Sequence, residues 1–233
     1  QGNSFIFGEA NSANKGGSIY AHESSLSITG GSLKNHNNEG TSDGAVAYVW
    51  ASNIFDVTNV EVKDNTSYGN GVLYIHSVPA TFDNVTATGN KASRGGVIYS
   101  SNAHTQITLT GGTFSGNSAS NGGVMYAENA NVTLVGGSYT GNSSTSNGGA
   151  ITLVGAQMNV SGDTLFKENS AVGHAGAIYV SYYNNTSAGT TNAGKLTMTG
   201  GTFEANSAMG GGAVSIRTGC EANLNGTKLT GNY

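Results

Sequence analysis

Residues 114–126 read Phe-Ser-Gly-Asn-Ser-Ala-Ser-Asn-Gly-Gly-Val-Met-Tyr. The stretch holds two motifs that recur in one order along the protein: an apolar residue followed three positions later by Asn, and a glycine pair followed by a short β-prone run. The first residue after the glycines stands at positions 18, 45, 72, 97, 124, 150, 177 and 213. The protein therefore consists of about eight copies of a repeat of about 25 to 27 residues, with one interval of 36.

Each copy contains three short segments with alternating apolar side chains, too short and too rich in β-branched residues for helices. Gly and Asn separate the segments, as is typical of corners that need a positive φ. An unchanged motif order favours a solenoid over hairpins, because equivalent residues then stack about 4.8 Å apart. We predict an all-β fold: a right-handed, single-stranded parallel β-helix of about eight coils, forming a single domain over residues 1–233 that is open at both ends.

Columns of apolar residues are expected to line the interior of this helix. One column follows the glycines and contains Ile19, Val46, Leu73, Ile98, Met125, Ile151, Ile178 and Val214. A second contains Ile28, Val57, Phe82, Leu109, Leu134, Met198 and Leu224, with the coil that ends at Asn169 out of step by about one residue. The apolar residue of the Asn motif, such as Phe114, forms a third column on another wall.

The recurring Asn is interpreted as a buried structural ladder whose amides bond to equivalents above and below and to turn backbone. His36 takes this place in the copy that begins with Leu33. The predicted ladder consists of Asn11, Asn65, Asn90, Asn117, Asn142, Asn169, Asn206 and Asn232.

A column of tyrosines follows the glycine pairs and is expected to point outward, opposite the interior column. Two interpretations stay open: a contact surface for carbohydrate or protein, or a ladder of rings that support one another. The column contains Tyr20, Tyr74, Tyr99, Tyr126 and Tyr179.

Composition excludes some partners. Charged residues make up 9% of the protein and the net charge is −4, with no Lys/Arg stripe for a nucleic acid. No apolar run is long enough to insert into a membrane. The five histidines share no column and no spacing suited to a metal, so no metal or other cofactor is expected.

Catalysis in a β-helix would need clustered carboxylates, and the best candidates are Asp56 and Asp83, which we expect on one face in diagonal positions. They are interpreted as a solvated pair without a third carboxylate or an Arg. Lys167 and Glu204 should stack as a surface ion pair. Pairs such as Thr108 and Thr110 suggest an ice-binding array, but acidic and apolar residues interrupt it.

The paired motifs resemble the passenger domains of the chlamydial polymorphic outer membrane proteins, which repeat a Gly-Gly-Ala-Ile-like tetrapeptide and Phe-x-x-Asn. The residues that carry the likeness are Gly149-Ala150-Ile151, Gly176-Ala177-Ile178, Phe114–Asn117, Phe166–Asn169 and Phe203–Asn206. The resemblance extends over nearly the whole sequence and weakens before residue 90. It implies a secreted, surface-exposed β-helix that acts in adhesion, and function carried over in this way is an analogy.

The long interval contains an insertion at about residues 181–194, expected to be a loop that protrudes from one corner. Asn184 and Asn185 on this loop are the most plausible glycosylation acceptors. The first and last residues both resemble the Asn-bearing segment. Subunits could therefore stack head to tail, with Phe5, Phe7, Leu229 and Tyr233 in contact, or the stretch could belong to a longer helix.

The sequence thus favours an extracellular or cell-surface, non-enzymatic structural or adhesive β-helix, either a filament subunit or a segment of an adhesin stalk. Expected partners are other copies of the protein, joined head to tail or laterally, and a carbohydrate or host-surface receptor. The alternative is a polysaccharide lyase or hydrolase of pectinase-like architecture.

Overall fold

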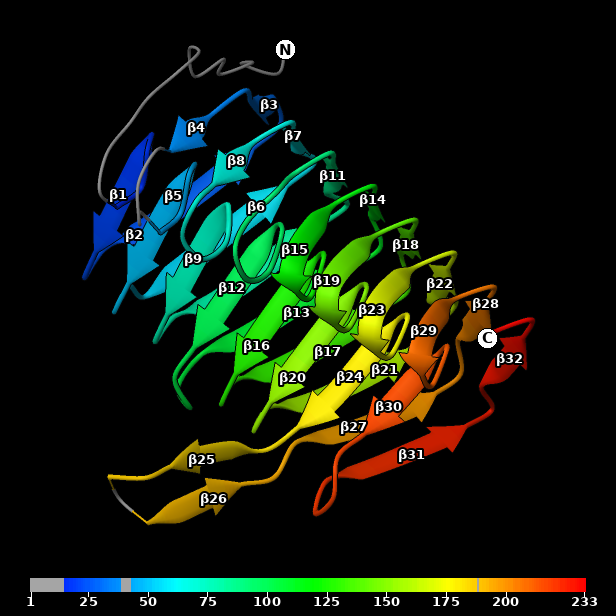
Figure 1. Ribbon diagram of the computed structural model, residues 1–233. Helices are drawn as coiled ribbons and strands as arrows, with labels where there is room; N and C mark the ends of the chain where they lie inside the picture. Colours follow the sequence, from blue (N-terminus) through cyan, green and yellow to red (C-terminus); the bar gives the residue numbers. More distant parts are fainter. Residues whose placement is uncertain (1–14, 39–42, 188) are drawn as a thin grey trace.

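The computed structural model describes residues 15–38, 43–187 and 189–233. Over these residues all regular secondary structure is β, and the strands stack in parallel into a β-solenoid of about eight coils (Figure 1). The predicted parallel β-helix is therefore confirmed. Consecutive coils pair strand on strand, so the backbone hydrogen bonds run between coils along the axis of the rod.

Sheet 1 follows the glycine motif and has eight strands in the order of the coils. Its members are β1 (Ile19–His22), β5 (Ala47–Trp50), β9 (Leu73–His76), β12 (Ile98–Ser101), β16 (Met125–Glu128), β20 (Ile151–Val154), β24 (Ile178–Ser181) and β30 (Val214–Ile216). At its entry Gly122 has a φ of +65° and a Cβ there would collide with the Met125 carbonyl, so the motif needs glycine.

Sheet 2 also has eight parallel strands. They are β2 (Ser25–Thr29), β6 (Ile54–Thr58), β10 (Pro79–Asp83), β13 (Gln106–Thr110), β17 (Asn131–Val135), β21 (Gln157–Ser161), β27 (Lys195–Thr199) and β31 (Glu221–Asn225). The second predicted column is confirmed, and Val160 fills the place beside Leu134 in the coil that was out of step.

Sheet 3 carries the apolar residue of the Asn motif and has eight strands. They are β3 (Ser32–Lys34), β7 (Glu61–Lys63), β11 (Thr86–Thr88), β14 (Thr113–Ser115), β18 (Ser138–Thr140), β22 (Leu165–Lys167), β28 (Thr202–Glu204) and β32 (Lys228–Thr230). Phe114, Tyr139, Phe166 and Phe203 stack inside it with ring centroids 5.0 Å apart. Lys167 and Glu204 pair across it at 2.8 Å, as predicted.

The expectation of three segments per coil is wrong for much of the rod, because a fourth wall follows the ladder Asn. Sheet 4 contains β15 (Ser118–Asn121), β19 (Ser143–Asn147), β23 (Ser170–His174) and β29 (Ser207–Gly210). A pair formed by β4 (Asn37–Asn38) and β8 (Thr66–Ser67) occupies the same wall in the early coils. The sequence pattern does not predict this wall, because its strands are rich in Ser, Asn and Gly, which are typical of turns.

The first interior column needs one correction. Ala47 pairs with Ile19 and Leu73, and Val46 does not. In the second coil two residues, Ala45 and Val46, lie between the glycine and the strand, whereas in the third coil Val72 alone lies there. The shift places Tyr48 in the tyrosine column, where the sequence pattern had left a gap.

The Asn ladder is present from Asn65 to Asn232; Asn11 lies outside the described residues. The Nδ2 of Asn142 donates to Oδ1 of Asn169 at 3.0 Å and to the Phe114 carbonyl at 2.9 Å. Its Oδ1 accepts from the backbone N and the Nδ2 of Asn117, each at 3.0 Å. Asn65, Asn90, Asn117, Asn142, Asn169 and Asn206 are fully buried, so each amide satisfies backbone groups that no water reaches.

At the other end of the ladder His36 occupies the predicted place and is fully buried. Its backbone N donates to Oδ1 of Asn65 at 3.0 Å and its Nδ1 lies 2.8 Å from Oγ of Ser18. Its Nε2 has no hydrogen-bond partner among the described residues. Burial lowers the pKa of the ring, because desolvation disfavours the charged form.

We predict that Asn142→Ala lowers the free energy of unfolding by about 3 kcal/mol, because it leaves buried hydrogen-bonding groups in the two neighbouring coils without a partner. The matched control is Asn131→Ala, an exposed Asn in the same coil, for which the loss should stay below about 0.5 kcal/mol. Urea unfolding followed by circular dichroism measures both. Equal losses for the two variants would contradict a structural ladder.

The buried imidazole of His36 predicts a pH dependence of stability. Below the ordinary His pKa of about 6.5 the unfolded state binds more protons than the folded one, so the free energy of unfolding falls as the pH drops through that value. Replacing His36 with Asn should flatten the dependence, whereas the control His104→Asn, at an exposed position, should not. Urea midpoints measured from about pH 5 to pH 8 test this, and an unchanged slope in His36→Asn would refute it.

Candidate functional site

The outward face of sheet 1 carries two parallel columns of side chains. The first is the tyrosine column, and in coil order it reads Tyr20, Tyr48, Tyr74, Tyr99, Tyr126, Thr152, Tyr179 and Ser215. The second lies two residues later on each strand and reads His22, Trp50, His76, Ser101, Glu128, Val154 and Ser181. Because a strand alternates its side chains, both columns project from the side opposite the core.

The tyrosines form a continuous stack over five coils. Neighbouring ring centroids from Tyr20 to Tyr126 are 4.4 to 5.6 Å apart, with interplanar angles of 4° to 22°. Stacking covers the ring faces, so Tyr99 is only 6% exposed, whereas Tyr20 at the end of the stack is 52% exposed. The rings therefore support one another, and the open part of the column is at its N-terminal end.

Tyr179 stands apart from this stack because Thr152 interrupts the column between Tyr126 and Tyr179. Its ring stacks with His174 at 6.1 Å and is 9% exposed. The C-terminal part of the predicted contact column is thus largely covered.

The second column overturns the expectation that no histidines share a column. His22 stacks on Trp50 at 4.5 Å, and His76 meets the edge of the same indole at 6.3 Å. The signal in the sequence is that Tyr-x-His occurs at both Tyr20 and Tyr74, two coils apart. Trp50, which is 37% exposed, joins His22 and Tyr20 in an aromatic platform at the N-terminal end of the face.

The insertion between sheets 1 and 2 forms an antiparallel hairpin of β25 (Tyr183–Asn185) and β26 (Thr190–Asn192). Figure 1 shows it leaving the coils and extending back along the rod. The Nδ2 of Asn192 donates to Oδ1 of Asn129 at 2.9 Å, and Nε2 of Gln157 donates to the Ala193 carbonyl at 3.2 Å. These bonds anchor the end of β26 to earlier coils.

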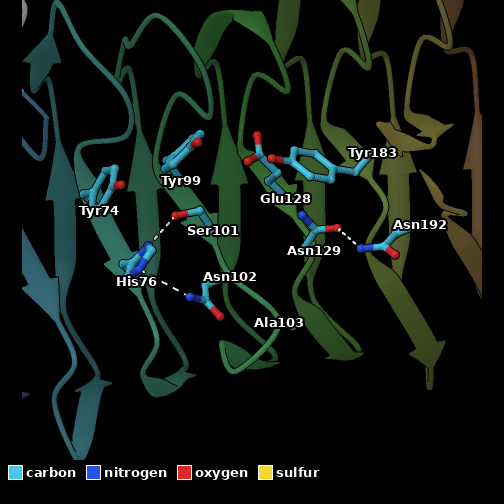
Figure 2. Close-up of a pocket in the computed structure, with 10 residues that line it drawn as sticks. All are labelled: Tyr74, His76, Tyr99, Ser101, Asn102, Ala103, Glu128, Asn129, Tyr183 and Asn192. Carbon is cyan, nitrogen blue, oxygen red and sulfur yellow. Dashed lines mark hydrogen bonds between the residues drawn. The ribbon is translucent and has the colours of Figure 1, made fainter. Parts of the chain in front are cut away.

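The hairpin walls a groove of about 470 Å³ on the outward face of sheet 1 (Figure 2). A second space of about 390 Å³ adjoins it, and the two share Ala103, Asn129 and Asn192. The lining residues of the larger space are Tyr74, His76, Tyr99, Ser101, Asn102, Ala103, Glu128, Asn129, Tyr183 and Asn192. Both volumes fall in the range of about 300–1,000 Å³ common for small-ligand sites.

His76 is fixed at one edge of the groove. Its Nδ1 lies 2.8 Å from Oγ of Ser101, and the Nδ2 of Asn102 lies 3.4 Å from its Nε2. Desolvation by burial lowers the pKa of this imidazole, so the neutral ring is favoured.

Glu128 lies at the centre of the groove, and Figure 2 shows the Tyr183 ring directed from the hairpin toward its carboxylate. No hydrogen bond or ion pair from the described residues reaches that carboxylate. Burial raises the pKa of Glu128, and the positive charge of Arg94 opposes part of this shift. Arg94 itself lies over the Tyr126 ring, 5.5 Å from its centroid, and is not part of the lining. Glu128 is therefore a partly desolvated acceptor that faces open space.

This groove was not anticipated from the sequence. Tyr74 and Tyr99 were expected as contact residues, but Glu128, Asn129 and the hairpin contribution were not. Glu128 has one sequence signal, since it follows Tyr126 by the same two positions that separate His76 from Tyr74. The approach of Asn192 to Asn129 has none, because it depends on how the hairpin folds back.

The other predicted site residues lie apart from the groove. Asn184 is exposed on the hairpin, and Asn185 pairs there with Thr190. At the C-terminal coil Leu229 is 54% exposed and Tyr233 is 77% exposed. Phe5 and Phe7 fall outside the described residues, so head-to-tail stacking stays a prediction.

Asp56 and Asp83 lie on neighbouring strands of sheet 2, where Asp56 pairs with Thr81 and Asp83 with Thr58. They are thus diagonal, as expected, and lie on a different sheet from Glu128. Within the described residues no group of three or more His, Cys, Asp or Glu side chains could hold a metal ion. Those same residues include no helix long and apolar enough to cross a membrane.

Comparison with known family models, curated proteins and solved structures finds no match to this protein. The class of protein is therefore defined by the fold alone: a parallel β-solenoid with an aromatic outward face and a hairpin-walled groove.

We predict that Asn192→Ala releases the hairpin without weakening the rod. Loss of the amide bond to Asn129 should raise the hydrogen-exchange rates of the β25–β26 amides severalfold, while the ladder strands keep their protection. Ser187→Ala, an exposed change in the turn of the same hairpin, is the control. Hydrogen-exchange mass spectrometry gives the answer, and unaltered exchange in the hairpin would show that Asn192 does not anchor it.

Proposed function

We propose that this protein is a non-enzymatic structural or adhesive β-solenoid that acts outside the cell or on its surface and presents the outward face of sheet 1 to a partner. The observation that carries the proposal is the aromatic face itself: Tyr20, His22 and Trp50 are exposed at one end, and the groove with Glu128 lies farther along. A rigid scaffold that displays aromatic groups suits recognition, because little side-chain entropy is lost on contact.

The rigidity of the scaffold supports this role. A ladder of buried amides joins successive coils from Asn65 to Asn232, and a stack of tyrosines joins the five coils from Tyr20 to Tyr126, so the spacing of the outward side chains is held constant. The resemblance of the Gly-Gly and Phe-x-x-Asn motifs to chlamydial surface adhesins points to the same class of function, and it is also the support for an extracellular location.

The lyase or hydrolase alternative receives less support from the geometry. Glycoside hydrolysis ordinarily uses two carboxyl groups that flank the scissile bond. Glu128 is the single carboxylate that lines the groove among the described residues, and Asp56 and Asp83 lie on a different sheet. A binding role for the face is therefore preferred.

The test uses beads coated with the full-length protein and a panel of animal epithelial cells, bacterial cells and plant cell-wall fibres. We expect attachment to at least one surface under flow. The double variant Tyr20→Ser with Trp50→Ser should reduce attachment about tenfold, because it removes the exposed aromatic area. Tyr68→Ser is the control, since Tyr68 is 60% exposed but is not on sheet 1.

Two results would count against the proposal. One is failure of the beads to attach to every surface in the panel. The other is catalytic release of reducing ends or unsaturated uronates when the protein is incubated with plant or bacterial polysaccharides, which would favour the enzyme alternative.

A further inference from the structure

We infer that the groove beneath the β25–β26 hairpin is a binding site for an uncharged oligosaccharide, with Glu128 as the central acceptor for sugar hydroxyls and Tyr183 as an aromatic wall. The inference rests on the proposed adhesive function and gives the ligand class for the same face.

Glu128 is the first part of the case. Its carboxylate is partly buried on the strand β16, lines the groove, and has no hydrogen-bond donor among the described residues. A partly desolvated carboxylate gains most from a ligand that brings donors to both oxygens. Two adjacent hydroxyls of a sugar ring supply such a pair without adding a charge.

The amides around Glu128 add matching donors and acceptors. The bond between Asn192 and Asn129 uses one Nδ2 and one Oδ1, so the Nδ2 of Asn129 and the Oδ1 of Asn192 remain available at the border of the two spaces. An amide offers both a donor and an acceptor to a hydroxyl group, which is itself both. The border therefore suits a ligand with hydroxyls in several directions.

The charges on the lining exclude an acidic glycan. No Lys or Arg lines either space, and Arg94 is held over the Tyr126 ring. A sulfate or uronate in the groove would face the negative charge of Glu128, while Arg94, whose charge acts on this carboxylate, stays outside the lining and cannot contact the ligand's acid group. The ligand is therefore an uncharged oligosaccharide.

The lining also disfavours a peptide. Protein partners anchor themselves by burying aromatic or aliphatic side chains in apolar pockets. In this groove the aliphatic contribution is the methyl group of Ala103, and the remaining lining side chains carry hydroxyl, imidazole, amide or carboxylate groups. Three tyrosines contribute to the lining, and the ring faces of Tyr74 and Tyr99 are covered within the tyrosine stack. The ring of Tyr183 is outside that stack and can pack against the C–H face of a sugar.

The test applies the full-length protein to an array of immobilised oligosaccharides that includes uncharged hexose and N-acetylhexosamine oligomers as well as sulfated and uronic-acid oligomers. We expect binding to the uncharged oligomers, with acidic oligomers of the same length at least about tenfold weaker. Glu128→Gln should lower the affinity for the uncharged oligomers about tenfold. It should also reduce the ratio between the affinities for uncharged and acidic oligomers, because the repelling charge is removed. Tyr183→Ser should lower all affinities by a similar factor.

Two controls accompany these variants. Glu204→Gln alters a carboxylate that pairs with Lys167 on sheet 3, and Tyr68→Ser alters an exposed tyrosine outside the groove. Both should bind the array as the unmodified protein does. The far-ultraviolet circular dichroism of every variant should match that of the unmodified protein, which separates loss of ligand from loss of fold.

Three outcomes would overturn the inference: no uncharged glycan binds, the groove variants bind as well as the controls, or a lysine-rich peptide used as a probe binds in a Glu128-dependent way while the glycans do not. The bead assay is read beside the array. Attachment of beads without any glycan binding would refute the oligosaccharide site but not the adhesive function. Failure in both assays would refute the oligosaccharide site and the adhesive function together.

Discussion

From Asn65 onward the coils of this protein depend on one repeated hydrogen-bond pattern, in which the side-chain amide of an Asn bridges three successive coils. Its Oδ1 accepts from the backbone and side chain of the preceding Asn, and its Nδ2 donates to the next Asn and to a backbone carbonyl of the preceding coil. Backbone groups at this corner face the interior, where water cannot satisfy them. The ladder solves that problem once for each coil, and the three long sheets keep their registers around it.

Much of this architecture can be predicted from residue patterns because the repeated features have strong local causes. Glycine at Gly122 and Asn at Asn142 have few substitutes, so their spacing reveals the coil. Prediction was weaker where many residue types can form the same structure. Sheet 4 is made of small polar residues that suit a turn equally well, and the single extra residue near Ala45 was enough to misplace Val46 and to hide Tyr48.

Most of the groove could not be predicted from the sequence, for a different reason. Glu128 and His76 share one column because each follows a tyrosine of the stack by two residues, a spacing that is visible in the sequence. The hairpin has no equivalent in other coils, so repetition says nothing about where Asn192 comes to rest. Its place is decided by a tertiary contact with Asn129, and that contact turns an open face into a walled groove.

The direction of the ladder bonds has a consequence for the rod as a whole. From Asn65 to Asn206 every ladder amide donates one N–H toward the C-terminal coil and directs its carbonyl oxygen toward the N-terminal one. The buried amides therefore add head to tail into an axial dipole, comparable in origin to that of an α-helix. A coil that extends the ladder beyond Asn232 must therefore offer an acceptor. The two ends of the ladder therefore differ, and two rods could not continue each other's ladder through their C-terminal coils, because both would present donors.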